Sequence, residues 1–146
     1  MKPLAKVVAV ALSVCVPAAL IMPANAEPPL TVMGFAKAAY NDSASSEVVV
    51  TLTRVDQDPA TANEAFTLDC AVTAGTAVEN VDYRLAPGLG TITFAPGVAE
   101  QTITVYTVRN PGPAKTLVIG CSNPSGPAPA ATGEHPVAHI TIVNTP

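Results

Sequence analysis

Short runs in which apolar and polar residues alternate follow one another along most of this 146-residue chain. Residues 66–70 read Phe-Thr-Leu-Asp-Cys, and residues 117–121 read Leu-Val-Ile-Gly-Cys. Alternate side chains of a β-strand point to the same face, so each run predicts a strand with one buried face. No window shows a sustained helical period, and the fifteen prolines disfavour long helices. The pattern therefore indicates an all-β protein.

The predicted strands are spaced by turn residues. They cover residues 48–54, 66–72, 82–85, 91–94, 101–108, 117–121 and 137–143, with a split first strand over residues 30–40. The sequence Ala-Pro-Gly-Leu-Gly at residues 86–90 predicts a hairpin connection. Residues 122–135, rich in Pro, Ala and Gly, are expected to form a long exposed loop. Together these elements predict an immunoglobulin-like antiparallel β-sandwich of about seven strands.

The N-terminus has the pattern of a secretory signal peptide. Lys2 and Lys6 precede an apolar run over residues 7–22, and Ala24-Asn25-Ala26 supplies the small residues of a cleavage site. We therefore expect residues 1–26 to be a signal peptide and residues 27–146 to be one domain. Cys15 raises a lipoprotein alternative, which Val14 disfavours because a small residue is required there. The product is expected to be periplasmic or extracellular, with no transmembrane segment after signal removal.

The balance of acidic and basic residues limits the kinds of partner that this protein is expected to bind. Without the predicted signal peptide, five basic residues face eleven acidic ones, and no cluster of Lys and Arg exists. A nucleic-acid partner is therefore disfavoured, and the acidic excess is interpreted as an aid to solubility.

Two cysteines, Cys70 and Cys121, remain after the predicted cleavage. An even number of cysteines in an exported chain indicates a disulfide, and both residues fall on the apolar face of their strands. Two buried free thiols are the alternative.

Several segments in this order resemble a Calx-beta domain, the β-sandwich repeat named after the regulatory region of sodium–calcium exchangers. The matching segments are residues 50–54 (Val-Thr-Leu-Thr-Arg), 66–72, 75–77 (Gly-Thr-Ala), 82–83 (Asp-Tyr), 90–97, 117–123 and 138–142. In that family the strands that resemble the two cysteine-containing runs are sheet neighbours, which implies that Cys70 and Cys121 can meet inside the sandwich.

The resemblance also implies a calcium site, whose acidic residues are largely missing here. Family members that bind calcium supply a run of Asp and Glu after the fifth strand and acids after the last strand. Here those places hold residues 109–115, with Arg109 and Lys115, and residues 143–146. Asp82 matches a ligand position, and Asp42 lies near another. Because calcium takes six to eight oxygen ligands, we expect no cofactor; Asp82 is expected to cap a turn.

Catalytic motifs are absent from the sequence. His139 is expected to point outward from the last strand, His135 precedes a proline, and no GxSxG element occurs. We therefore expect a protein that is not an enzyme.

The sequence favours an exported, non-catalytic module with a structural, adhesive or protein-binding role at the cell envelope, with an envelope or extracellular protein as its unknown partner. The alternative is a calcium-binding Calx-beta module with a weak or degenerate site. Candidate binding-loop residues are Arg109, Asn110, Lys115 and Asn123. The predicted loop after residue 121 is a second candidate contact surface.

Overall fold

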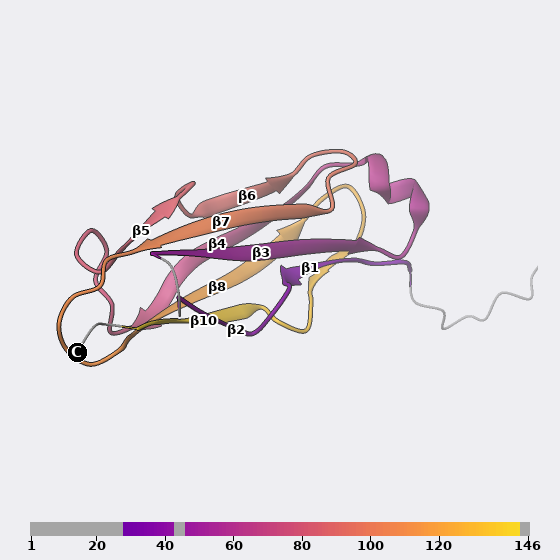
Figure 1. Ribbon diagram of the computed structural model, residues 1–146. Helices are drawn as coiled ribbons and strands as arrows, with labels where there is room; N and C mark the ends of the chain where they lie inside the picture. The colour runs from indigo at the N-terminus through magenta and orange to yellow at the C-terminus, as the bar shows by residue number, and fades with distance from the viewer. Residues whose placement is uncertain (1–27, 43–45, 144–146) are drawn as a thin grey trace, which may run out of the picture.

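Two β-sheets pack face to face in the computed structural model, which describes residues 28–42 and 46–143 (Figure 1). The predicted signal peptide lies outside the described residues. The first sheet has the order β5 (Tyr83–Ala86), β7 (Glu100–Thr107), β3 (Glu47–Asp56), β1 (Thr31–Phe35), β9 (Ala130–Thr132). The second has the order β2 (Ala39–Asn41), β10 (Val137–Ile142), β8 (Lys115–Ser125), β4 (Phe66–Gly75), β6 (Gly90–Phe94). A short 3₁₀ helix, η3 (Pro59–Asn63), joins β3 to β4.

The predicted all-β sandwich is confirmed. Neighbouring strands are antiparallel except at the pairs β1–β9 and β2–β10, which are parallel. The described part of the chain has ten strands rather than about seven: the seven runs predicted after residue 47, the two arms of the split first strand, and β9, which was not expected.

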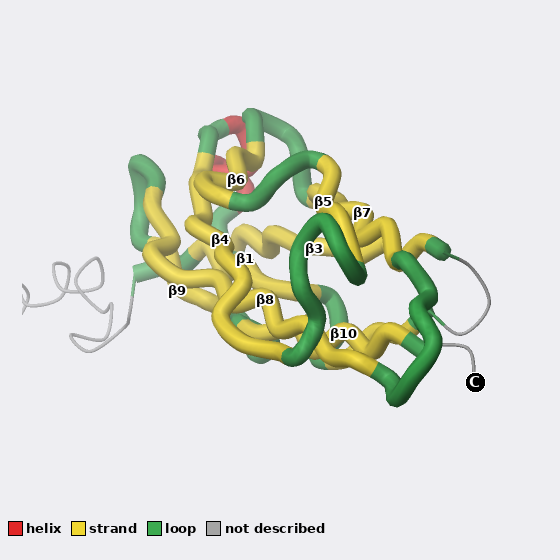
Figure 2. The backbone as a smooth tube through the Cα atoms, turned by 90° about the vertical axis from the view of Figure 1, so that its left-hand side faces the viewer, coloured by secondary structure: helices red, strands yellow, loops and turns green. Residues whose placement is uncertain are grey.

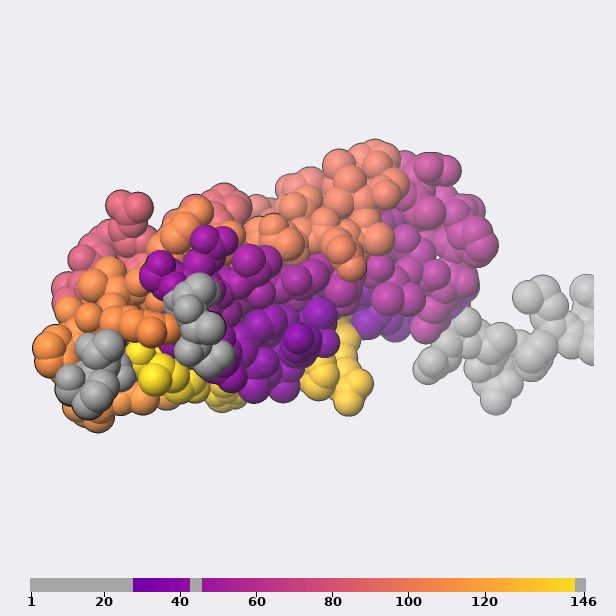
Figure 3. Space-filling model, viewed as in Figure 1, coloured from indigo at the N-terminus to yellow at the C-terminus, as the bar shows by residue number. Residues whose placement is uncertain are grey.

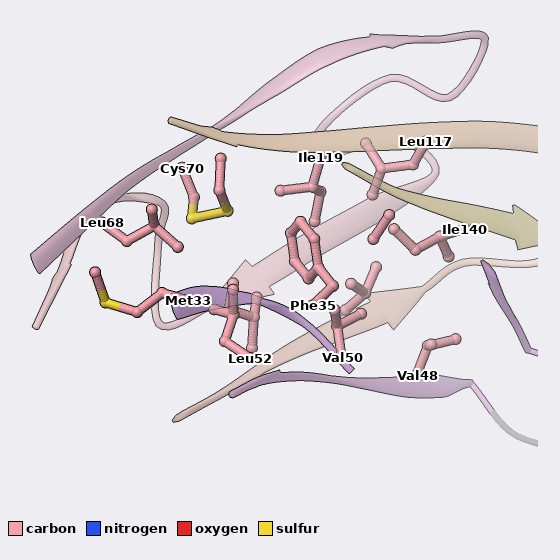
Figure 4. Close-up of a cluster of buried hydrophobic side chains, with 14 of the residues drawn as sticks. Met33, Phe35, Val48, Val50, Leu52, Leu68, Cys70, Leu117, Ile119 and Ile140 are labelled. Atoms are coloured by element: carbon pink, nitrogen blue, oxygen red, sulfur yellow. A yellow bond between two sulfur atoms is a disulfide. The ribbon is translucent and has the colours of Figure 1, made fainter. Parts of the chain in front are cut away.

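The core lies between the sheets and follows the alternation of the sequence. In β3, Val48, Val50 and Leu52 are buried, and in β8 Leu117 and Ile119 have no exposed surface. Figure 4 shows these side chains converging with Met33 and Phe35 of β1. Burial of such side chains, each contributing about 1.5–3 kcal/mol, is the main force that holds the two sheets together.

The first strand is split as predicted. β1 pairs with β3 in the first sheet, and β2 pairs with β10 in the second. Between them the Ala36 N–H donates to the Thr51 carbonyl oxygen at 2.9 Å, which keeps the crossing segment beside β3.

The predicted hairpin over residues 86–90 is wrong. β5 pairs with β7 in the first sheet, whereas β6 pairs with β4 in the second, so this connection crosses between the sheets. Turn composition indicated where the chain bends, but it did not indicate which strand each arm would join.

The prediction of one long exposed loop over residues 122–135 is also wrong. β8 continues to Ser125, and β9 then joins the first sheet beside β1. The His135 and Pro129 carbonyl oxygens accept hydrogen bonds from the Phe35 and Thr31 N–H groups. Gly126 makes the crossing possible because a Cβ there would lie 2.2 Å from the Phe66 ring. The segment is therefore part of the sandwich.

The predicted disulfide between Cys70 and Cys121 is present. The two residues lie directly opposite each other on β4 and β8, with 4.1 Å between their Cα atoms, and both are buried. Figure 4 shows the bond beside Leu68 and Ile119 in the core.

Candidate functional site

One end of the sandwich gathers buried acids and cations from loops that are far apart in the sequence. β2 and β7 end there, at Asn41 and Thr107, and β8 begins there at Lys115. Figure 2 looks onto this end and shows loop segments lying across it. We call the cluster formed by Asp42, Asp82, Thr107, Arg109, Asn110 and Lys115 the paired end.

Asp82 is the first buried acid of the paired end, with no exposed surface. Its Oδ2 accepts a hydrogen bond from the Val78 N–H at 2.8 Å, so it caps the preceding turn as expected. Lys115 Nζ donates to both carboxylate oxygens, at 2.9 and 3.0 Å, and Asn110 Nδ2 donates to Oδ1 at 3.0 Å. Each carboxylate oxygen therefore has donors from the protein itself.

Asp42 is the second buried acid, with 1% of its surface exposed. The Thr107 hydroxyl donates to Oδ2 and the Val143 N–H donates to Oδ1, each at 2.7 Å. The Arg109 guanidinium donates to the Asp42 carbonyl oxygen, and its Nε lies 3.7 Å from Oδ2. Through these hydrogen bonds Asp42 connects the C-terminal ends of β2, β7 and β10.

The two acids are linked through the backbone of the segment after β7. The Val108 N–H donates to the Asp82 carbonyl oxygen at 2.7 Å, one residue after Thr107 contacts Asp42. The space-filling view shows the orange segment near residue 110 and the pink segment near residue 80 lying together at this end (Figure 3). Residues separated widely in sequence therefore form one hydrogen-bonded cluster.

Electrostatics favour the ionised form of Asp82. Hydrogen bonds from Lys115 and from the Val78 N–H hold the pKa of this carboxyl below its usual value, against the opposing effect of burial. Burial, together with the charge of Glu79, raises the pKa of the neighbouring Tyr83. Asp82 is therefore ionised throughout the neutral pH range.

The candidate binding-loop residues separate into two places. Arg109, Asn110 and Lys115 all contact the buried acids of the paired end. Asn123 lies on β8 instead, where its Nδ2 donates to Asp69 Oδ2 at 3.3 Å. The sequence identified the loop but gave no sign that its cations turn inward.

A buried cation, Arg54, lies outside the paired end, and the sequence did not lead us to expect it. Arg54, 4% exposed, donates to Asp56 and to the carbonyl oxygens of Thr61 and Glu64. Its guanidinium also lies 4.5 Å from the centre of the Phe66 ring. The signal was available: Arg54 stands at a position of β3 that alternation assigns to the core, with Asp56 two residues later.

The described residues contain neither a cluster of metal ligands nor a helix of membrane-spanning length. Residues 28–42 and 46–143 contain no group of three or more His, Cys, Asp and Glu side chains placed to hold a metal ion. His139 is exposed on β10, as expected. Over the same residues, no helix is long and apolar enough to cross a membrane.

The fold is similar to solved Calx domains. The apo-form Calx CBD1 domain matches with a TM-score of 0.63 and 20% identity, over 80% of this chain and 98% of that domain. The Calx CBD2 domain matches with a TM-score of 0.64 and 12% identity, over 78% of this chain and 86% of that chain. CBD12 from CALX1.2 matches with a TM-score of 0.62 and 20% identity, over 77% of this chain and 44% of that one.

These likenesses confirm the predicted resemblance at the level of the fold. No protein-family model matches the sequence, and a comparison with curated proteins finds no match. One similar structure is described as a calcium binding domain, CBD12 of CALX1.1. The paired end can therefore be tested for its fit to this ion.

The residues of the paired end do not fit calcium. The ion takes six to eight oxygen ligands, mostly from several carboxylates. Here the four carboxylate oxygens of Asp42 and Asp82 already accept hydrogen bonds or lie next to a cation. Arg109 and Lys115 also place two positive charges beside them, which repel a divalent cation. The described residues therefore form an end that is neutralised by the protein's own side chains.

Proposed function

We propose that this chain is an exported, non-catalytic β-sandwich module with a structural, adhesive or protein-binding role at the cell envelope, and that it acts without calcium. The observation that carries the proposal is the paired end. There, Arg109 and Lys115 neutralise Asp42 and Asp82, so the loops are joined by protein contacts alone. A scaffold of this kind presents the same surfaces whatever the ion concentration.

Export is supported by two independent features. Residues 1–26 have the charge and apolar pattern of a signal peptide. The Cys70–Cys121 disulfide suits an oxidising compartment such as the periplasm or the extracellular space.

Cell fractionation followed by mass spectrometry of the intact protein tests the export proposal. We expect a chain that starts at Glu27, carries no free thiol, and is found in the periplasmic or extracellular fraction. An unprocessed chain with three free thiols in the cytoplasm would overturn it.

Calcium binding is the second candidate, and the presence of Asp42 and Asp82 at one end favours it. The two functions differ in their dependence on the metal. Thermal unfolding of the protein in millimolar calcium and in chelator separates them, because a ligand that binds the folded state raises the unfolding temperature.

A further inference from the structure

β4 extends beyond the strand that should cover its edge. It pairs with β8 along its length, through Thr67 to Gly75, but with β6 only over Phe66–Cys70. Residues 71–75 of β4 are exposed, and no described strand pairs with them on the β6 side. The second sheet therefore has an open edge five residues long where β6 has ended.

The backbone of this edge is directed outward. Cys70 and Cys121 have the short Cα separation, 4.1 Å, of a pair that exchanges no backbone hydrogen bonds. In agreement, the Cys121 N–H donates a hydrogen bond to the Pro136 carbonyl oxygen, on the side of β8 that faces away from β4. The alternation of an antiparallel ladder then turns the N–H and C=O of Val72 toward the open side. Such groups are a template for an added strand.

Two hollows flank the open edge, one on each side of the line that an added strand would follow. The outer hollow, about 480 Å³, lies on the outer face and includes Asp69, Ala71, Thr73 and Thr91 in its lining. The inner hollow, about 470 Å³, includes Val72, Glu79, Leu85 and Leu89. Successive side chains of an extended strand point to opposite faces, so they would enter the two hollows in turn.

Neighbouring edges are covered by the protein itself. Gln101 Nε2 donates to the Thr93 carbonyl oxygen on β6 at 2.9 Å. On β5, Tyr83 forms a bridge with Glu79 of the preceding loop. Residues 71–75 of β4 have no such cover among the described side chains, which distinguishes this edge from both neighbours.

Charge and polarity indicate what the edge would bind. Each hollow contains one carboxylate, Asp69 or Glu79, and neither hollow is lined by Lys or Arg. Asp69 accepts hydrogen bonds from Thr91 and Asn123, both uncharged. The inner hollow adds apolar surface from Val72, Leu85 and Leu89. A cationic side chain therefore suits the outer hollow, and an apolar one suits the inner hollow.

We propose that the β4 edge at residues 71–75 binds an extended segment of a partner protein in which apolar residues alternate with basic ones. The partner segment continues the line of β6 and completes the second sheet. This inference rests on the protein-binding role in the proposed function, and it assigns that role to a place in the fold.

The test uses an amide-resolved NMR titration of the protein expressed from its full sequence. The probe is a blocked heptapeptide of alternating Val and Lys, and the matched control has Glu in place of each Lys. We expect shifts concentrated at residues 70–75 and 88–91, with binding of the Glu peptide at least tenfold weaker. Shifts that map elsewhere, or equal binding of both peptides, would overturn the proposal.

Substitutions at and near residues 71–75 test whether the Val-Lys peptide binds at the β4 edge itself. Val72→Pro removes the outward N–H, and Ala71→Lys adds a cation to the outer hollow without removing a backbone donor. Each is expected to weaken the Val-Lys peptide at least tenfold. Asp69→Asn with Glu79→Gln is expected to weaken it about fivefold, whereas the control pair Glu100→Gln with Glu134→Gln leaves it unchanged. Undiminished binding by a folded Ala71→Lys variant contradicts the proposal.

Sedimentation equilibrium tests whether a second copy of this chain, rather than a partner protein, occupies the β4 edge. A dimer that Val72→Pro or Ala71→Lys abolishes would mean that a second copy of this chain covers the edge, and the partner-segment proposal would fail. If the exported protein binds an envelope partner through other residues while the peptide does not bind, the proposed function stands and the edge proposal falls.

Discussion

Asp42 and Asp82 are two buried acids whose partners all come from the protein itself. Both are almost completely buried, yet each has a cation and at least two other hydrogen-bond donors within reach. A buried carboxylate without such partners is strongly destabilising. The cations on residues 109–115 are therefore part of the fold, and their substitution should affect stability before any binding.

Lys115→Met is predicted to change how the free energy of unfolding depends on pH between neutral and acidic conditions. In the native protein the pKa of Asp82 is lowered, mainly by the hydrogen bond from Lys115. The ionised carboxyl therefore stabilises the folded state above the unfolded pKa of about 4, and this stabilisation is lost as the pH falls through the folded pKa. Without Lys115 the folded pKa rises. The variant should be clearly less stable at neutral pH, and the difference should narrow in acid.

Urea unfolding at neutral pH and at about pH 3 measures this effect. Lys37→Met is the matched control, because Lys37 is exposed and outside the paired end. An equal loss of stability at both pH values would contradict the assigned role of Lys115.

Arg54→Met is predicted to lower the free energy of unfolding by about 3 kcal/mol, since it removes the buried cation that pairs with Asp56 and donates to the Thr61 and Glu64 carbonyl oxygens. The control Arg84→Met removes an exposed cation and should change stability by less than about 0.5 kcal/mol. Denaturant unfolding of both variants checks the prediction, and equal effects would refute it.

At the scale of elements, alternation was a reliable guide to strands and a poor guide to their partners. It placed the buried faces of β4 and β8 and the two cysteines correctly. It could not assign β5 and β6 to different sheets, because both arms of residues 86–90 have similar local patterns. β9 was missed because Ala and Pro are weak strand formers, and its pairing with β1 is a tertiary contact.

The site was less predictable than the fold for a related reason. Asp42, Asp82 and the loop cations were recognised as candidates, but the direction of Arg109 and Lys115 depends on acids that lie 67 and 33 residues away along the chain. The open edge of β4 was not anticipated either, since it depends on the length of β6 relative to β4.

The disulfide joins the centres of two neighbouring strands and closes a loop with a sequence separation of 51 residues. Replacement of Cys70 and Cys121 together by Ala is predicted to cost about 4 kcal/mol through the entropy of the unfolded chain. Guanidinium unfolding of the variant measures this loss. Reduction of the native protein serves as the control, and a loss under about 1 kcal/mol in both would show that the crosslink contributes little.

At the scale of the molecule, internal ion pairs remove cations from the surface. Arg54, Arg109 and Lys115 pair with acids, so Lys37 and Arg84 are the cations that remain outside ion pairs within residues 28–42 and 46–143. The exposed charge is consequently acidic, which fits a basic partner segment at the β4 edge.

Replacement of the loop cations by acids should convert the paired end into a metal-dependent one. Arg109→Asp with Lys115→Asp would place four carboxylates at one end, so the variant should be destabilised in chelator by their repulsion. Millimolar calcium is then expected to raise its unfolding temperature by about 5 °C. The pair Arg109→Gln with Lys115→Gln is the control, which should lose stability without regaining it in calcium.

Calcium titration of the native protein, by calorimetry together with thermal unfolding, tests most directly whether the paired end is stable without a metal ion. The predicted result is no saturable heat up to about 5 mM calcium and the same unfolding temperature in calcium and in chelator. A saturable heat accompanied by a rise in unfolding temperature would contradict the account.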